Sequence, residues 1–377
     1  MYQVDEKWLE TVVGNIERKM QVVRERSANK IPYSTENGTH DDMTEQRVHW
    51  WTNGFWGGMQ WLMFDQTNDD RYKQIANIQE DKLDAGFEAY YGLHHDVGMM
   101  WSPTSVVNYK LTGNEQSHKR ALRAANFLAG RYNPVAKFIR AWNARKDEDV
   151  TGWSIIDTMM NLPLLYWASE ETGDPRYRQI ADSHAHTVMN HFVRKDGSVA
   201  HIIEFNPESG EVVRELGGQG YGVGSSWSRG QGWALYGFIL CYIHTKDEAY
   251  LDTAKRIAHY FIANVANDHY VPRVDFRSPA EPHLIDTTAS GIAASALIEI
   301  SKYVDDYEKD LYLKSAVSLL EALVENHTDW TDEQDNIVTD SSARYFEDDH
   351  HYAIIYGDFF FMEAIFKLNN NGLAIWQ

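Results

Sequence analysis

The sequence predicts an all-α protein, an (α/α)6 toroid or barrel of six inner and six outer helices that forms a single domain over residues 1–377. Two observations lead to this fold class. A short polar motif recurs along the chain, beginning at Thr67, Thr112, Thr172 and Thr245, and in a looser form at Val304. The segments before the motif are apolar on nearly all sides, whereas those after it are amphipathic. Helices that are apolar all round belong inside and amphipathic helices outside, so the pattern predicts two layers.

Each copy of the motif is interpreted as a tight turn between two helices. In the clearest copy, TGDPRYRQIA, Gly173 suits a left-handed end of one helix, Asp174 caps the next, and Pro175 occupies its first turn. Recurrence at intervals of about 45 to 75 residues is typical of stacked supersecondary units. The motif therefore predicts a chain of helical hairpins.

The inner helices are expected where the apolar segments lie, at residues 53–66, 97–111, 153–171, 229–245, 288–304 and 358–368. The outer helices follow the turns, and two of them cover residues 177–194 and 250–265. The amphipathic segment 5–26 completes the set as the outer partner of the first inner helix. Strand-like alternation at 201–206 and 269–276 is assigned to loops or small hairpins. An irregular all-α protein of two domains is the alternative, but no linker-like segment interrupts the pattern.

In a toroid of this kind every inner helix runs in the same direction, so six N-termini open on one face. Polar and aromatic clusters are concentrated near these ends, at residues 50–56, 93–98, 152–157, 225–233, 284–291 and 354–361. Helix N-termini carry partial positive charge, which favours an anionic ligand. The sequence therefore places the functional site on this face.

Composition narrows the class of partner. The net charge of −20 argues against nucleic acid or an anionic membrane, because either needs a basic surface. The 13 Trp and 21 Tyr favour a surface on which sugars or other flat ligands stack. A single cysteine, Cys241, excludes an internal disulfide framework and a cysteine-based zinc site. The N-terminal residues resemble no signal peptide and no apolar run spans a bilayer, so we expect a cytoplasmic protein.

Two aspartates are candidates for acid–base chemistry. Asp157 is expected in the first turns of a fully buried helix, where a carboxyl group is costly unless it is hydrogen-bonded or protonated. It is either a buried side chain satisfied by its neighbours or a general acid. Asp96, in the segment LHHDVG, is either a helix cap or a functional carboxylate.

The other polar residues near these ends are ambiguous. A metal site at His94, His95 and Asp96 is not expected, because adjacent side chains diverge and no spaced ligand motif supports them. Asp286 and Asp358 directly precede apolar segments and are either caps or catalytic residues, with the cap favoured. Arg229 is either an anion clamp or one half of a structural ion pair.

Phosphate-binding, serine-hydrolase and cysteine-nucleophile motifs are absent from the sequence. Two carboxylates in an aromatic bowl remain, and they suit sugar chemistry by acid–base catalysis.

Several segments resemble a known family when they are taken together. TNGFW, HHDVG, IIDTMMNLPLLYWASEETGDPRYR, SSWSRGQGWALYGF, DTTASG and YGDFFFMEAI are similar in order and spacing to the unsaturated glucuronyl hydrolases of glycoside hydrolase family 88. The resemblance covers residues 45–370. It implies a hydrolase that removes a 4,5-unsaturated uronic acid from the non-reducing end of oligosaccharides released by polysaccharide lyases, such as glycosaminoglycan fragments. It also implies neither metal nor organic cofactor. We expect a monomer or weak homo-oligomer, although the sequence itself does not determine the oligomeric state.

The resemblance assigns roles to individual residues. Asp157 matches the general acid and base, which protonates C4 of the C4=C5 double bond before water adds at C5, and Asp96 matches the second essential aspartate. The positions that match substrate contacts are Trp51, His95, Trp142, His201, Gln219, Trp227, Arg229, Trp233 and Tyr352. Relatives that favour sulfated substrates carry a basic segment before the last inner helix. Glu347, Asp348 and Asp349 stand in that region here, so our hypothesis is a preference for unsulfated substrates.

Two other functions remain open. The related family 105 of unsaturated rhamnogalacturonyl hydrolases shares the toroid and the hydration chemistry, but the His-His-Asp segment favours the glucuronyl branch. A sugar-binding protein that has lost catalysis is the second alternative, and the presence of both Asp96 and Asp157 argues against it.

Overall fold

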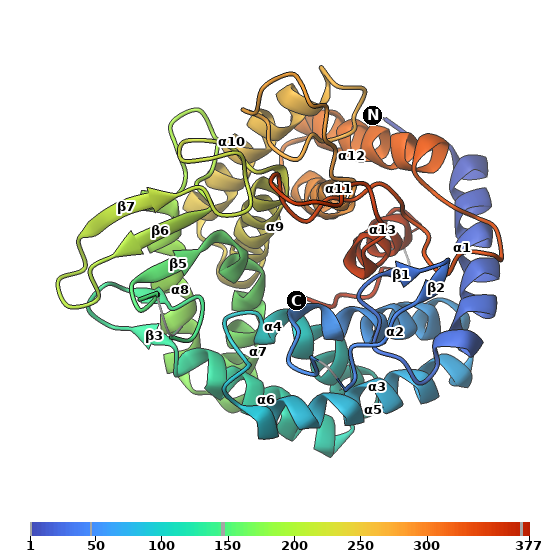
Figure 1. Cartoon of the computed structure of the whole chain (residues 1–377), viewed down its shortest axis with the longest axis horizontal. Helices are drawn as coiled ribbons and strands as arrows, with labels where there is room; N and C mark the ends of the chain where they lie inside the picture. Colours follow the sequence, from blue (N-terminus) through green and yellow to red (C-terminus); the bar gives the residue numbers. More distant parts are fainter. Residues whose placement is uncertain (1, 46, 145–147, 370–371) are drawn as a thin grey trace.

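The computed structural model describes residues 2–45, 47–144, 148–369 and 372–377. Its helices form two concentric layers (Figure 1). The inner layer consists of α2 (Phe55–Thr67), α4 (Val97–Trp101) continued by the π-helical segment η2 (Ser102–Val106) and α5 (Val107–Thr112), the 3₁₀ turn η3 (Ile156–Asn161) with α7 (Leu162–Thr172), α9 (Ser228–Thr245), α11 (Thr288–Ser301) and α13 (Ile355–Leu368). Contacts pass from each inner helix to the next, and contacts between α13 and α2 close the ring.

The outer layer surrounds this ring. It consists of α1 (Glu6–Ser27), α3 (Asp70–Ala89), α6 (Glu115–Ala129), α8 (Pro175–His191), α10 (Glu248–Val265) and α12 (Asp306–Asn326). In the described part of the chain this amounts to six inner and six outer helices, which confirms the predicted toroid.

The predicted turns join the hairpins as expected. The inner helices α2, α5, α7 and α9 end at residues in the left-handed conformation, which are Asn68, Gly113, Gly173 and Lys246. The next outer helices begin after capping side chains that accept backbone N–H groups, namely Asp69, Asn114, Asp174 and Asp247. The fifth turn is the looser one, because Lys302 after α11 is right-handed and Asp305 makes no capping bond.

The sixth pair differs from the predicted one. Helix α1 packs mainly along α13, the last inner helix, although Trp56 and Gln66 of the first inner helix also donate hydrogen bonds to it. The hairpin order explains the difference: each inner helix is followed by its own outer helix, so α2 already has α3, whereas α13 is left uncovered at the end of the ring. The two ends of the helical array therefore cover each other.

The third inner helix is shorter than the segment 153–171 predicted for it. Residues Trp153–Ile155 form strand β5, which pairs antiparallel with β6 (Ile202–Phe205), and β6 pairs with β7 (Val212–Leu216). Figure 1 places this small sheet at the edge of the ring. The extended backbone of β5 delivers the chain into η3, so the α-helix begins only at Leu162.

The remaining strands are short. Strands β1 (Thr35–Glu36) and β2 (Thr39–His40) form one hairpin, and β3 (Tyr132–Asn133) and β4 (Phe138–Ile139) form another. The second alternating segment, 269–276, forms only isolated bridges, between Trp227 and Asp275 and between Arg273 and Ile285.

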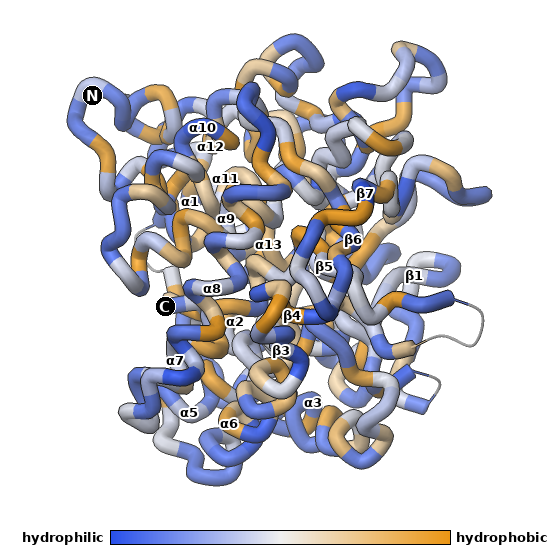
Figure 2. Tube along the Cα trace, turned by 90° about the vertical axis from the view of Figure 1, so that its left-hand side faces the viewer, coloured by the Kyte–Doolittle hydropathy of each residue, from blue (hydrophilic) through white to orange (hydrophobic). Residues whose placement is uncertain are grey.

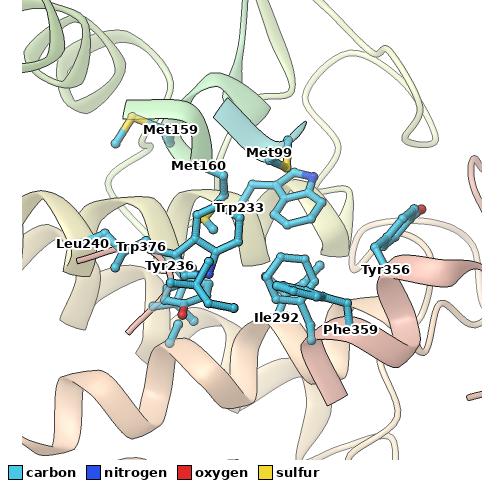
Figure 3. Packing of buried hydrophobic residues seen from close by; sticks show 14 of the residues in the cluster. Met99, Met159, Met160, Trp233, Tyr236, Leu240, Ile292, Tyr356, Phe359 and Trp376 are labelled. Atoms are coloured by element: carbon cyan, nitrogen blue, oxygen red, sulfur yellow. The ribbon is translucent and has the colours of Figure 1, made fainter. Parts of the chain in front are cut away.

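The core fills the space between the inner helices. Figure 3 shows how its rings and thioethers interdigitate, with Trp233, Tyr236, Ile292, Phe359 and Trp376 among them. Hydrophobic residues follow the inner helices while hydrophilic ones dominate the periphery (Figure 2). In the described residues we find no helix with both the length and the apolar character needed to cross a bilayer.

Candidate active site

A cavity of about 360 Å³ opens where the inner helices begin. Its lining residues are Tyr33, His49, Trp50, Trp51, Gly92, His94, His95, Asp96, Trp142, Ile155, Asp157, Gln219, Trp227, Arg229, Ala343, Arg344 and Tyr356. They come from the N-terminal ends of α9 and α13, from Asp96 just before α4, from the 3₁₀ turn η1 (Trp51–Gly54) before α2, from β5 and η3, and from loops that join the layers. Residues of five of the six predicted clusters thus meet at the cavity, whereas residues 284–291 are not among its described lining residues.

The cavity brings together eight of the eleven residues that the sequence singles out. These are Trp51, His95, Asp96, Trp142, Asp157, Gln219, Trp227 and Arg229. The other three, His201, Trp233 and Tyr352, are not among the described residues that line it.

Asp157 lies in the turn η3 and not in an α-helix as predicted. The strand β5 directs the chain toward the cavity, so the carboxyl group reaches the lining while the residue stays 7% exposed. Its Oδ2 atom has no hydrogen-bond partner among the described residues. That oxygen is inaccessible to solvent and lies on the side of His201, but the residue as a whole lines the cavity, so its carboxyl group is placed to exchange a proton with a ligand.

His201 acts behind Asp157. Its Nδ1 accepts a hydrogen bond from the backbone N–H of Gln219 at 2.9 Å, so the neutral ring carries its proton on Nε2. That atom lies 3.6 Å from Oδ2 of Asp157. The ring also packs against Trp227, with 4.3 Å between centroids. His201 therefore lies beneath the cavity wall, in contact with the ring of Trp227 and close to Asp157 without a hydrogen bond to it.

A glycine permits this arrangement. Gly218 has φ +60°, and a Cβ atom there would lie 2.0 Å from Nδ1 of His201. The loop can close over His201 only because residue 218 has no side chain.

Asp96 occupies the N-cap position of α4 but does not cap it, since its side chain accepts no backbone N–H group of that helix. Capping was one of the two predicted roles, and it is wrong for this side chain. Its Oδ1 instead lies 3.1 Å from Nε2 of His95 and accepts a hydrogen bond from Nδ2 of Asn161 at 3.0 Å. Burial favours the neutral acid, but the charge of His95 and these hydrogen bonds outweigh it and hold the pKa of Asp96 below its ordinary value.

His95 is the cation of this pair. Its Nδ1 lies 2.8 Å from the backbone oxygen of Ala141 and donates to it, so an ion pair with Asp96 requires a second proton, on Nε2. Nε2 lies 3.1 Å from Oδ1 of Asp96 and has no other partner among the described residues. Burial lowers the pKa of His95, but the charge and hydrogen bond of Asp96 raise it further, and the net pKa lies above the ordinary value. Asp96 and His95 form a buried carboxylate–imidazolium pair at the cavity wall.

His94 has a different charge state. Burial lowers its pKa to about 3, so its ring is neutral. Its Nδ1 lies 3.6 Å from Oδ2 of Asp96. The side chains of His94, His95 and Asp96 do not diverge as predicted, because their possible ligand atoms lie within 4.8 Å of one another. A metal ion here would have to displace the second proton of His95, and the raised pKa of His95 opposes that.

Arg229 lines the cavity and is also half of a buried ion pair. Its Nη1 donates to Oδ2 of Asp286 at 2.7 Å and to Oγ1 of Thr288 at 3.1 Å. The guanidinium stacks over Trp227 and Tyr356, at 4.6 and 5.3 Å from the ring centroids. Burial works to lower its pKa, but Asp286 raises it overall, so Arg229 remains cationic. The interpretation of Arg229 as half of an ion pair is therefore confirmed. If Arg229 also binds an anion, the carboxylate of Asp286 already neutralises part of its charge.

Of the two predicted helix caps, Asp286 and Asp358, only one serves the start of its helix. Asp286 accepts the N–H of Thr288 at 3.2 Å and so serves the start of α11. Asp358 is not a cap, because its carboxylate accepts the backbone N–H groups of Ile337 and Val338 from a neighbouring loop. Burial raises its pKa to about 7.

Besides His201, two predicted substrate contacts are not among the described residues that line the cavity. Trp233 is fully buried and packs edge to face against Trp51, 6.4 Å between centroids, so it supports that wall from behind. Tyr352 pairs with Ser341 in an isolated bridge and packs against the main core. Trp233 is thus not among the described residues that line the cavity, and its predicted contact with a ligand stays a prediction.

Sequence reasoning missed several members of the site. Tyr33, Trp50, His49, Arg344 and Tyr356 line the cavity, and Asn161 contacts Asp96 beneath it. Trp50 and Tyr356 lie inside clusters that the sequence marks, so their position was a usable signal. Tyr33 and Arg344 lie on long loops, where no periodicity indicates the direction of a side chain.

An (α/α)6 ring with two carboxyl groups in an aromatic cavity suits a glycoside hydrolase. The chain matches the Glycosyl Hydrolase Family 88 over residues 23–240. It is 35% identical over 335 residues to the unsaturated glucuronyl hydrolase of Bacillus sp. (strain GL1), which covers 86% of this chain and 88% of that one. The unsaturated chondroitin disaccharide hydrolase of Streptococcus pneumoniae (strain ATCC BAA-255 / R6) is 31% identical over 339 residues, covering 86% and 83%.

The solved structures agree. The crystal structure of the unsaturated glucuronyl hydrolase from Bacillus sp. GL1 superposes with a TM-score of 0.90 at 31% identity and covers 98% of each chain. The chain belongs to glycoside hydrolase family 88.

Proposed function

We propose that this enzyme removes a 4,5-unsaturated uronic acid from the non-reducing end of oligosaccharides by hydration of the C4=C5 double bond. The observation that carries the proposal is the pair of carboxyl groups in unlike environments. Asp96 lies beside the imidazole of His95, which favours its ionised form, while Asp157 lines the cavity and its Oδ2 atom has no hydrogen-bond partner among the described residues. The names of the relatives support the substrate class, since they are hydrolases of unsaturated glucuronyl and unsaturated chondroitin substrates.

The proposed reaction begins with proton transfer from Asp157 to C4. The π electrons form the new C4–H bond, and positive charge develops at C5 and the ring oxygen. The carboxylate of Asp96 stabilises this charge from the cavity wall. Water then adds at C5 and gives a proton to Asp157, which regenerates the acid. The hemiketal opens to a C5 ketone, and the hemiacetal left at C1 collapses with release of the aglycone.

The proposed binding residues surround this chemistry. Trp51, Trp142 and Trp227 offer ring faces for the sugar, and Gln219 offers an amide. Arg229 and the helix N-termini supply the positive potential that a uronate carboxylate requires. The substrate roles of His201, Trp233 and Tyr352 are proposed as indirect, through the residues that they support. No step needs a metal or organic cofactor.

The ultraviolet absorbance of the conjugated alkene provides the assay. The enzyme is expected to bleach unsaturated chondroitin disaccharides and to leave unsaturated rhamnogalacturonan disaccharides largely intact. The reverse preference would assign the activity of family 105, and bleaching of neither would point to a sugar-binding protein.

We further propose that residues 1–377 act as a single catalytic domain, as a monomer or weak homo-oligomer in the cytoplasm. The closed ring and the buried free Cys241 support this, because neither depends on a partner chain or a disulfide. Sedimentation at micromolar concentration tests the oligomeric state.

A further inference from the structure

The N-terminus of α4 is capped by a residue from another element. Asp96 stands at the N-cap position, where its carboxylate would normally accept the N–H of the second or third helical residue. The N–H of Met99, the third residue, instead donates to Oδ1 of Asn161 at 2.8 Å. Asn161 is fully buried at the end of η3, 65 residues away in the chain. It takes over the capping task and leaves both oxygens of Asp96 free for other partners.

The same amide joins the two catalytic segments. Its Nδ2 donates to Oδ1 of Asp96 at 3.0 Å and to the backbone oxygen of Asp157 at 3.1 Å. One side chain therefore holds the helix start that carries Asp96 against the turn that carries Asp157.

Gly98 makes this contact possible. A Cβ atom at residue 98 would lie 2.6 Å from Cα and 2.7 Å from Oδ1 of Asn161. Such separations are well inside van der Waals contact, so a larger residue would push η3 away from α4. The glycine in the segment HHDVG serves this close approach.

We propose that Asn161 is a positioning residue for the acid–base pair. It holds Asp96 and Asp157 in a fixed relative position, and it keeps the carboxylate of Asp96 ionised and free of the N-terminus of α4. The inference rests on the proposed function of the two aspartates. Asn161 itself lies beneath the cavity wall and is not among the described residues that line it, so its effect passes through Asp96 and Asp157.

The charge environment makes the effect measurable. Asp96 faces His94 and His95 on its own segment and Asn161 on η3, and Asp157 acts on the charge of His95. More distantly, burial lowers the pKa of Arg131 and the charge of Asp96 opposes that change. The amide of Asn161 adds a donor that favours the carboxylate, so its loss should raise the pKa of Asp96.

The variant Asn161→Asp tests the proposal, because it keeps an acceptor for Met99 and replaces the donor to Asp96 by a carboxyl oxygen. Loss of a hydrogen bond to a charged group corresponds to about one to two pKa units. The acid limb of the kcat–pH profile is expected to rise by at least about one pH unit, with KM changed less than about twofold. A ¹³C titration of the Asp96 carboxyl should show the same shift without turnover.

Asn108→Asp is the matched control. Asn108 is buried, and its Nδ2 donates to Oε2 of Glu80, so the change again sets one carboxyl against another, but far from the cavity. It should lower the thermal unfolding temperature and leave the acid limb unchanged.

Asn161→Ala is the second variant, and it should shift the limb in the same direction. The proposal would be overturned in favour of a purely structural role if the Asn161 variants fold and keep the acid limb of the wild type. It would also be overturned if both Asn161 variants fail to fold while Asn108→Asp folds. An inactive wild-type enzyme would defeat the proposed function instead, and the ¹³C titration would still decide the role of Asn161.

Discussion

Replacement of His95 by glutamine tests the buried ion pair beside the cavity. Nε2 of His95 lies 3.1 Å from Asp96, and both residues are at most 5% exposed. A glutamine keeps a polar side chain but removes the positive charge. Hydrogen bonds to charged groups contribute about 1.5–3 kcal/mol, which corresponds to about one to two units in the pKa of the acid. Asp96 should then remain protonated to higher pH.

The kcat–pH profile on an unsaturated disaccharide is the assay. His95→Gln should move the acid limb upward by about one to two units, whereas His94→Gln should move it by less than about half a unit, because His94 is already neutral. Equal shifts in the two variants, or none in His95→Gln, would refute the assignment of the charge to His95.

The same pair sets a window of stability. The pKa of Asp96 is lowered in the folded state, so its contribution is present above the ordinary pKa and is lost as the pH falls. The pKa of His95 is raised, so its contribution is present below the ordinary value and is lost as the pH rises through the raised one. The pair stabilises the fold between these limits.

Three further predictions follow from the site and the core. Trp51→Ala should raise KM with a small change in the unfolding temperature. Trp233→Ala should lower the unfolding free energy by about 3–5 kcal/mol, since Trp233 is fully buried. Similar KM values and similar denaturant titrations for the two variants would contradict these roles. Burial raises the pKa of Asp358 to about 7, so ionisation of this residue is disfavoured in the folded state. Between pH 4 and 8 the unfolding free energy of the wild type should therefore fall by up to about 4 kcal/mol more than that of Asp358→Asn. Parallel pH dependences in the two proteins would contradict this explanation. Prolonged dialysis against EDTA should leave kcat unchanged. If activity is lost and a divalent ion restores it, a metal site at His94, His95 and Asp96 would be indicated instead.

Local chemistry accounts for what the sequence predicts well. The residues at the turns, such as Gly173 and Asp174, determine helix ends through their own backbone preferences, so they can be recognised without the fold. The apolar character of α11, in which residues 288–300 are all buried, is equally local. These signals suffice for the two layers and for the face on which Asp96 and Asp157 meet.

Contacts between distant segments account for what the sequence does not predict. The cap of α4 comes from Asn161 and the partner of Arg229 from Asp286, 57 residues along the chain. Strand β5 forms only because β6 lies beside it, which shortens the third inner helix. Trp233 is of a residue type that often stacks on sugars, but its burial next to Trp51 depends on how the whole ring of helices packs.

The central claim is that Asp157 protonates C4 of an unsaturated uronic acid, and turnover in D₂O tests it most directly. The account predicts one deuteron delivered stereospecifically to C4 in the product at early times, with no turnover by Asp157→Asn although that variant still binds the disaccharide. Release of the aglycone without deuterium at C4, or an active Asp157→Asn enzyme, would contradict the account.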